Sequence, residues 1–127
     1  MNPDLEIVPT HRDESFRAWV HDYPHSVAKW HFHPEYEIHL IQASRGKVFV
    51  GDHIGDFGPG NLIVTGPNLP HNWVSELADG ERVPSRDVVL QFSRDAIEKM
   101  VDAFSELQPV IELIDDAARG VQFPDRI

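Results

Sequence analysis

The segment WHFHPEYEIH (residues 30–39) places three histidines and two glutamates within ten positions, between segments in which apolar and polar residues alternate. Such alternation is typical of β-strands, whose side chains point to opposite faces in turn. Imidazole and carboxylate groups are costly to bury unless something pairs them. The segment therefore indicates that a strand of this protein carries a polar site.

The spacing of these residues suits a metal ion. His31 and His33 share one face of a strand and stand about 6.6 Å apart along it. Glu37 has the same parity, and Pro34 interrupts the strand because proline donates no backbone hydrogen bond. A kink at that point would bring the carboxylate toward the imidazoles, and His71 from a distant segment would complete the set. Three imidazoles and a carboxylate can hold a divalent transition ion with open coordination positions.

The spacing alone leaves an alternative open, because a His-x-His pair also fits two solvated side chains on an open sheet face. Three further residues are candidate ligand contacts in the same cavity: His39, Trp73 and Gln91. His39 shares the parity of the first two histidines, and Trp73 shares that of the distant one. Gln91 is a polar residue inside an otherwise apolar strand. All three side chains are candidates to line the site, but His39 fits packing against a neighbour equally well, and a glutamine such as Gln91 more often bonds a backbone group.

The other histidines have no convergent partner in the sequence. We expect the following four on the surface: His11, His21, His25 and His53. Glu35 is expected to be solvated. Trp30 and Phe32 have the opposite parity to the paired histidines, so we expect them to pack outside the cavity.

Eight short strands are expected in the first part of the chain. They are predicted at residues 15–23, 27–33, 35–43, 47–50, 53–57, 61–65, 72–76 and 87–92, with a polar loop at residues 77–84. Turn signals rich in glycine and proline separate them, such as GPG at residues 58–60. Many short strands with such turns predict a sandwich or barrel.

Two helices are expected after residue 92, where the apolar period becomes helical. The first apolar stripe is Ile97, Met100, Val101 and Phe104, and the second is Val110, Leu113, Ile114 and Ala117. Ser93 suits an N-cap, Pro109 a first helical turn and Gly120 a C-terminal cap. The stripes either pack on the core or face a second copy of the chain.

The composition limits the function. The chain has 127 residues, enough for one domain with a core, and its net charge of -10 repels phosphate backbones. It has no cysteine, which excludes disulfides, thiolate metal sites and thiol nucleophiles. No secretory signal and no apolar run of membrane-spanning length is evident, so we expect a cytoplasmic protein without membrane contact.

Two motifs resemble those of cupins. HFHPEYE (residues 31–37) and GPNLPH (residues 66–71) are similar to the motifs through which these small β-barrels bind a metal. The resemblance implies a site for zinc, nickel, iron or manganese with the ligands His31, His33, Glu37 and His71. The ligand positions match, whereas framework positions differ at His25, Ser44, Gly66, Asn68 and Ser75.

A longer resemblance is to the N-terminal sensor domain of AraC-type transcription regulators. It is carried by residues 30–41, 50–73, 88–92 and 117–123. It implies a mostly β, cupin-like (double-stranded β-helix) barrel at residues 1–92, followed by two C-terminal α-helices in a dimerisation and linker segment at residues 93–127. It also implies a homodimer, a small-molecule effector, and DNA contact only through a C-terminal helix-turn-helix domain absent from this chain.

Two alternatives stay open. A free-standing metal-dependent cupin enzyme, such as an oxygenase or isomerase, would use the open positions of the ion for substrate. Beyond the expected ligands, only His39 is available there as an acid or base. A purely structural dimerisation barrel would need no ligand, because hydrogen bonds and water would satisfy its buried polar groups.

Overall fold

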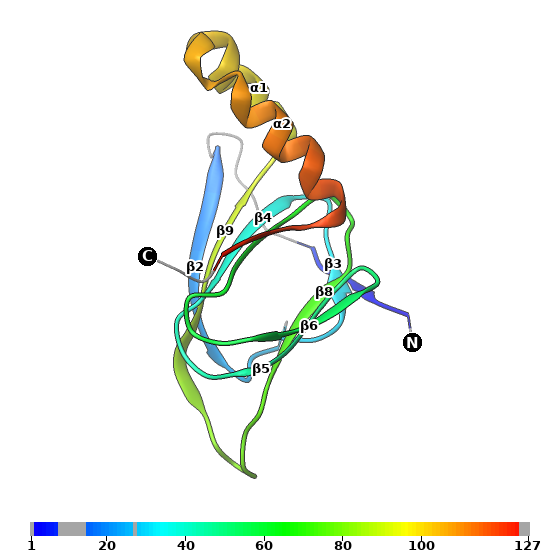
Figure 1. The fold of residues 1–127 in the computed structure, drawn as a ribbon, viewed down its shortest axis with the longest axis vertical. Coiled ribbons are helices and arrows are strands. Elements are labelled where there is room, and N and C mark those ends of the chain that lie inside the picture. Colours follow the sequence, from blue (N-terminus) through cyan, green and yellow to red (C-terminus); the bar gives the residue numbers. More distant parts are fainter. Residues whose placement is uncertain (1, 8–14, 27, 125–127) are drawn as a thin grey trace.

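The computed structural model describes residues 2–7, 15–26 and 28–124, and in these ranges ten strands form two facing sheets (Figure 1). The strands are β1 (Asp4–Leu5), β2 (Phe16–Tyr23), β3 (His31–Phe32), β4 (Tyr36–Ile41), β5 (Gly46–Val50), β6 (His53–Phe57), β7 (Leu62–Thr65), β8 (His71–Ser75), β9 (Val83–Phe92) and β10 (Val121–Phe123). The helices are α1 (Arg94–Ala103) and α2 (Pro109–Asp116), with 3-10 turns η1 (Ser105–Leu107) and η2 (Ala117–Arg119). The predicted fold class, a mostly β cupin-like barrel followed by two helices, is confirmed.

The turn at Pro34 carries the chain from one sheet to the other. One sheet has the order β1-β3-β8-β5-β6, and the other has the order β10-β7-β4-β9-β2. β3 ends at Phe32 and β4 begins at Tyr36, so the predicted kink is a complete change of sheet. Glu37 consequently faces His31 of β3, and His33 just after it, from the opposite wall of the barrel.

Some strand boundaries differ from the prediction. The strand expected at residues 27–33 is only two residues long, at His31–Phe32. The loop expected at residues 77–84 ends early, because Val83 of β9 pairs with Tyr23 of β2. β1 and β10 were not predicted, since strands of two and three residues are too short to show alternation.

The interior between the sheets is partly apolar and partly polar. The apolar cluster consists of Ile41, Val48, Val50, Phe57, Ile63 and Trp73. The buried polar side chains include His31, His33, Glu37, His39, Thr65, His71, Asp87 and Gln91. Because an unpaired polar group is costly to bury, these side chains must satisfy one another or a ligand.

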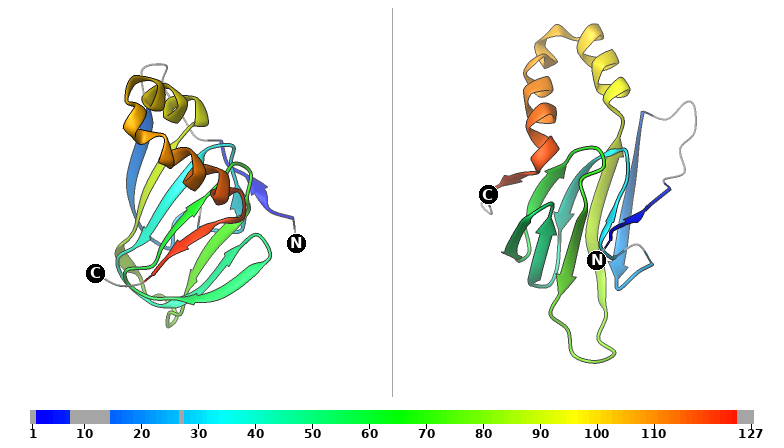
Figure 2. Two further views of the ribbon diagram at one scale, coloured as in Figure 1. Left: turned by 45° about the horizontal axis from the view of Figure 1, so that its top comes forward. Right: turned by 90° about the vertical axis from the view of Figure 1, so that its right-hand side faces the viewer.

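The helices follow β9 as an antiparallel pair that extends beyond one end of the barrel (Figure 2). Ser93 caps α1 by accepting a hydrogen bond from the amide of Ala96, as predicted. Ile114 of α2 packs on Tyr36 and Val64 at the outer face of a sheet. A side chain at Gly66 would lie 2.7 Å from a backbone oxygen of η2, so this position needs glycine.

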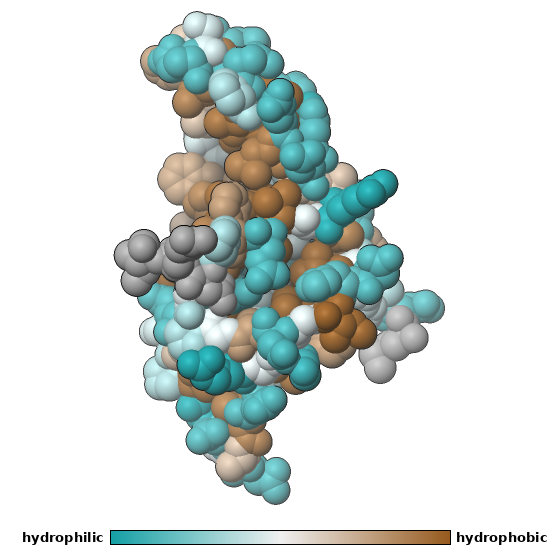
Figure 3. Space-filling model, viewed as in Figure 1, coloured by the Kyte–Doolittle hydropathy of each residue, from teal (hydrophilic) through white to brown (hydrophobic). Residues whose placement is uncertain are grey.

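The outer part of the helical pair stays exposed. Met100 is 45% exposed and Phe104 is 57% exposed, and hydrophobic surface follows the middle of the pair between hydrophilic side chains (Figure 3). After the helices, β10 returns to pair with β7, so the segment expected to be helical also contributes a strand. Among the described residues, neither helix has the length and hydropathy needed to cross a bilayer.

Candidate metal and ligand site

The four predicted metal ligands come together inside the barrel. His31 and His71 are directly paired residues of β3 and β8, and the ring centroid of His71 lies 4.5 Å from that of His31 and 4.9 Å from that of His33. Glu37, on β4, reaches them from the other sheet. Its Oε1 lies 3.1 Å from Nε2 of His33, and its Oε2 lies 3.4 Å from Nε2 of His71. All four side chains are buried.

The backbone fixes how the three histidines present their ring nitrogens. Nδ1 of His31, His33 and His71 lies 2.5, 3.1 and 2.8 Å from the carbonyl oxygens of Lys29, Glu35 and Leu69, respectively. A carbonyl only accepts, so each Nδ1 donates, and in the neutral ring the lone pair is on Nε2. His33, whose pKa is raised by its hydrogen bond to Glu37, presents this lone pair only after Nε2 has lost its proton. One ring nitrogen of each histidine lies within 4.8 Å of those of the other two. Metal-binding histidines are held in this way, with the second nitrogen donating to a carbonyl.

The charges of the cluster leave one buried atom without a partner. Burial lowers the pKa of His71 to about 4, so this ring is neutral at pH 7 and its Nε2 accepts no hydrogen bond in the described structure. Burial alone would raise the pKa of Glu37, but His71 and hydrogen bonds from His33 and His39 hold it well below its usual range. At pH 7 no proton therefore bridges Nε2 of His71 and Oε2 of Glu37, whereas a divalent cation would bind both atoms.

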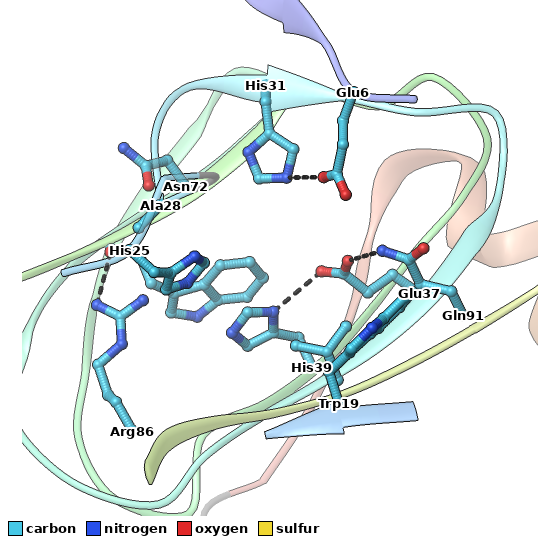
Figure 4. Close-up of a pocket in the computed structure, with 12 residues that line it drawn as sticks. Glu6, Trp19, His25, Ala28, His31, Glu37, His39, Asn72, Arg86 and Gln91 are labelled. Atoms are coloured by element: carbon cyan, nitrogen blue, oxygen red, sulfur yellow. Dashed lines mark hydrogen bonds and ion pairs between the residues drawn. The ribbon is translucent and has the colours of Figure 1, made fainter. Parts of the chain in front are cut away.

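Glu6 is a fifth group at the cluster, and it was not predicted. It follows β1, and its Oε1 lies 3.3 Å from Nε2 of His31 (Figure 4). In the sequence, residues 2–7 show no pattern long enough to predict a strand, so nothing there indicated that Glu6 points inward. Two carboxylates, Glu6 and Glu37, thus contact the three imidazoles.

His39 lies beside the cluster and connects two carboxylates. Its Nδ1 is 3.0 Å from Oε2 of Glu37, and its Nε2 is 3.1 Å from Oδ1 of Asp87. Burial alone would lower the pKa of His39, but the hydrogen bonds to Asp87 and Glu37 raise it. The ring stacks on Trp73 with centroids 3.7 Å apart. His39 is therefore an imidazolium held rigidly between an indole and two carboxylates.

Arg86 and Asp87 support His39 from the first half of β9. Arg86 is 1% exposed, and its Nε and Nη2 donate to Asp87 at 2.8 and 3.1 Å. The guanidinium also lies 3.8 Å from the ring centroid of Tyr23. Burial would raise the pKa of Asp87, but hydrogen bonds from His25, His39 and Arg86 lower it. The pair fixes one side of the cavity.

The predicted ligand contacts line a small cavity beside the cluster. Its wall includes His31, Glu37, His39, Trp73, Arg86 and Gln91 (Figure 4). Gln91 donates to Glu37 at 3.0 Å, while its Oε1 is buried without a partner in the described structure. The volume is about 40 Å³, enough for about three water molecules or an ion with some of its water.

The structure differs from the expectation for two of the four histidines expected on the surface, His25 and His21. His25 lines the cavity, its Nε2 lies 3.4 Å from Oδ2 of Asp87, and its ring stacks on half-buried His21. The prediction for His25 failed because the position of the turn after β2 is set by the pairing of β2 with β9, which the local sequence pattern does not show. His53 is exposed as predicted, and His11 lies outside the described residues.

Glu35 also differs from its prediction. Its side chain is 20% exposed, and its Oε1 is buried without a hydrogen-bond partner in the described part of the chain. It lies 3.9 Å from Nδ1 of His33, so it adds negative potential to the site. Trp30 and Phe32 are half-buried and do not belong to the cavity lining described above.

Comparison with known proteins places this architecture in a family. The family model described as AraC-like ligand binding domain matches residues 16–120. The chain belongs to this family. This AraC-like domain is also similar to ToxT from Vibrio cholerae O395, solved with (E)-4-(8-methylnaphthalen-1-yl)but-3-enoic acid, over 88% of this chain and 51% of that chain. The identity is 10% and the TM-score is 0.43, and this chain spans about half the length of that one.

No curated protein matches the sequence. The family places the AraC-like domain among the ligand-binding domains of transcription regulators. It therefore points to a regulatory domain rather than to the free-standing cupin enzyme that the sequence had left open.

Proposed function

We propose that this chain is the effector-sensing and dimerisation domain of an AraC-type transcription regulator, and that it binds a divalent transition ion through His31, His33, Glu37 and His71. The observation that most strongly supports a bound ion concerns His71. Nε2 of His71 is buried, has no hydrogen-bond partner in the described structure and faces a carboxylate oxygen. A cation is the species that stabilises both atoms at once.

The donor set limits which ion fits. Three imidazoles and a carboxylate suit zinc, nickel, iron or manganese, and no thiolate is present to favour softer ions. When bound, the ion would supply open coordination positions for an oxygen or nitrogen of an effector. The residues themselves hold and orient the ligands: three backbone carbonyls fix the imidazoles, and His39 and Gln91 hydrogen-bond to Glu37.

The cavity wall favours a small polar effector. Gln91 presents an unused acceptor, and the stacked rings of His39 and Trp73 form a flat wall. At about 40 Å³ the cavity holds an ion with water, so an organic effector would have to widen it. Such widening would be regulatory only if the effector binds two arrangements of the domain with different affinity.

The remaining roles follow from the family. The net charge of -10 disfavours DNA contact by this chain, so the operator would be read by a helix-turn-helix domain outside it. The exposed apolar residues of the helices, Met100 and Phe104, would lie in a homodimer interface. A regulator of this kind acts on DNA in the cytoplasm, where we place the protein.

Calorimetric titration of EDTA-treated, dialysed protein with Zn²⁺ tests this proposal. We expect one ion per chain, and His71→Ala should weaken binding by about 100-fold or more, since loss of even an outer-shell partner costs 10–100-fold. His53→Ala is the matched control, because that histidine is exposed and lies on the edge strand β6, which β5 separates from His71 on β8, and it should leave binding unchanged. Equal binding by both variants, or no binding by the wild type, would reject the site and favour the purely structural barrel.

A further inference from the structure

The N-terminal segment at residues 2–7 is attached to the barrel mainly by its backbone. β1 pairs in parallel with β3, and the amides of Asp4 and Glu6 donate to the carbonyls of Trp30 and Phe32 at 3.1 and 2.8 Å. The apolar side chains of the segment contribute little, since Leu5 is 54% exposed and Ile7 is 79% exposed. A two-residue edge strand with so little apolar burial is weakly held.

The side chain of Glu6 is the inward contact of this segment. It is 19% exposed, and its Oε1 lies 3.3 Å from Nε2 of His31. The ion pair between Asp4 and Lys29, in contrast, is formed by side chains that are both more than half exposed. Exposed ion pairs of this kind stabilise little. The contact between Glu6 and His31 is therefore the side-chain contact best placed to strengthen the backbone attachment of the segment.

When the ring of His31 is neutral, its contact with Glu6 brings two acceptors together. Nδ1 of His31 is directed at the carbonyl of Lys29, which leaves the lone pair of the neutral ring on Nε2, facing the carboxylate. The same opposition of lone pair and carboxylate occurs between His71 and Glu37. A cation that satisfies one pair also lies near the other, because His31 and His71 are directly paired across β3 and β8.

We propose that Glu6 is a further ligand of the ion and that ion binding thereby fastens residues 2–7 onto β3. This inference rests on the metal site proposed above. The ion would then join three separate parts of the chain, namely the N-terminal segment, residues 31–37 from β3 through the turn into β4, and β8. Because linkage is reciprocal, the factor by which the ion stabilises the docked segment equals the factor by which docking raises ion affinity. Residues 2–7 would therefore be docked on β3 for a larger fraction of the time when the ion is bound than when it is absent.

Hydrogen exchange of the Glu6 amide, measured by NMR at one fixed pH, tests the coupling. The probe is Zn²⁺ alone, added to EDTA-treated protein at saturation. We expect the ion to slow exchange of the Glu6 amide by about tenfold or more. In Glu6→Gln the ion should no longer slow exchange at this amide, and Zn²⁺ affinity should fall by about tenfold or more. Asp4→Asn is the matched control on the same strand and should retain both effects.

The outcomes separate this inference from the metal site itself. If Zn²⁺ binds in a His71-dependent manner but leaves the Glu6 amide unaffected, and Glu6→Gln keeps wild-type affinity, the coupling is wrong and the metal site stands. If Glu6→Gln and Asp4→Asn lose affinity equally, the effect is general surface charge, and the assignment of Glu6 as a ligand is wrong. If the wild type binds no Zn²⁺, both proposals are overturned.

Discussion

Nε2 of His71 lies 3.4 Å from Oε2 of Glu37, and at neutral pH neither residue carries a proton that the two atoms can share. The contact joins β8 of one sheet to β4 of the other, so it lies between the two walls of the barrel. Two buried acceptors that face each other are unfavourable unless a cation lies near both. The arrangement is therefore better suited to an ion-bound state than to an ion-free one.

Ion affinity should depend on pH through His33. Burial would lower the pKa of this residue, but its hydrogen bond to Glu37 raises it above 6.5. A protonated imidazole cannot bind a metal, so protons compete with the ion as the pH falls into the range in which imidazole is protonated, most strongly below about pH 6. We expect Zn²⁺ affinity to drop by about tenfold or more between pH 8 and pH 5. A flat calorimetric titration series over this range would contradict the assignment of imidazole ligands.

The ion-free protein should lose stability between pH 6.5 and pH 4 because of His71. Its folded-state pKa of about 4 is below the ordinary value of 6.5, so in this window the unfolded state binds the extra proton and acid favours unfolding. The slope is at most about 1.4 kcal/mol per pH unit. The raised pKa values of His33 and His39 have the opposite effect on stability. Above pH 6.5 the folded state holds the extra proton, so the free energy of unfolding falls as the pH rises. The depressed pKa values of Glu37 and Asp87 lower the free energy of unfolding only as the pH falls below about 4.5.

Urea unfolding in EDTA at pH 6.5, 5.5 and 4.5 measures this dependence. His71→Gln should remove most of the slope, because glutamine does not titrate. His53→Gln should keep the slope, since His53 is exposed. Parallel stability curves for the wild type and His71→Gln would show that the ring is not buried in its neutral form.

Arg86→Lys should destabilise the fold by about 3 kcal/mol, the size expected when one member of a buried ion pair no longer fits. Lysine cannot reproduce the two hydrogen bonds to Asp87 together with those to the carbonyl of Trp73 and Oγ of Ser75. Arg82→Lys, at an exposed position of the preceding loop, serves as the control and should change the free energy of unfolding by less than about 0.5 kcal/mol. Equal effects of the two substitutions in urea unfolding would mean that the guanidinium of Arg86 has no structural role.

The exposed helical stripe should mediate dimerisation. Phe104 is 57% exposed and Met100 is 45% exposed, and a buried aromatic side chain contributes about 1.5–3 kcal/mol. Phe104→Ser should therefore raise the dimer dissociation constant by about tenfold or more, measured by light scattering across a concentration series. Val74→Ser, at an exposed position on β8, should leave the constant unchanged. A wild-type chain that remains monomeric at micromolar concentration would contradict dimerisation through this fragment.

Local sequence pattern predicted the parts of the site that lie on regular strands. Parity correctly predicted that His31 of β3 and His33, just after it, point to the same inner face. Glu37 also points inward as expected, but from β4 of the opposite sheet. The same rule applied to β9 would have found Asp87, which shares the parity of Gln91. Parity was informative because one face of each strand points into the barrel and the other points away from it.

The parts that the sequence did not predict depend on long-range contacts. Glu6 follows a strand of two residues that is defined only by its pairing with β3, so no alternation indicated it. His25 lies after β2, in a turn whose position relative to Asp87 is set by the pairing of β2 with β9. Arg86 was not expected inside, because an arginine at the start of a strand is more often solvated. The change of sheet at Pro34 likewise required the three-dimensional arrangement of β4 between β7 and β9.

The metal content of protein purified without a histidine tag decides whether the cluster of three histidines and Glu37 is a metal centre. Elemental analysis of the wild type and of His71→Ala, each quantified per chain, should show one divalent transition ion in the wild type and none in the variant. An ion retained at equal stoichiometry in His71→Ala, or a wild-type protein that neither contains nor takes up such an ion, would contradict a metal centre built from His31, His33, Glu37 and His71.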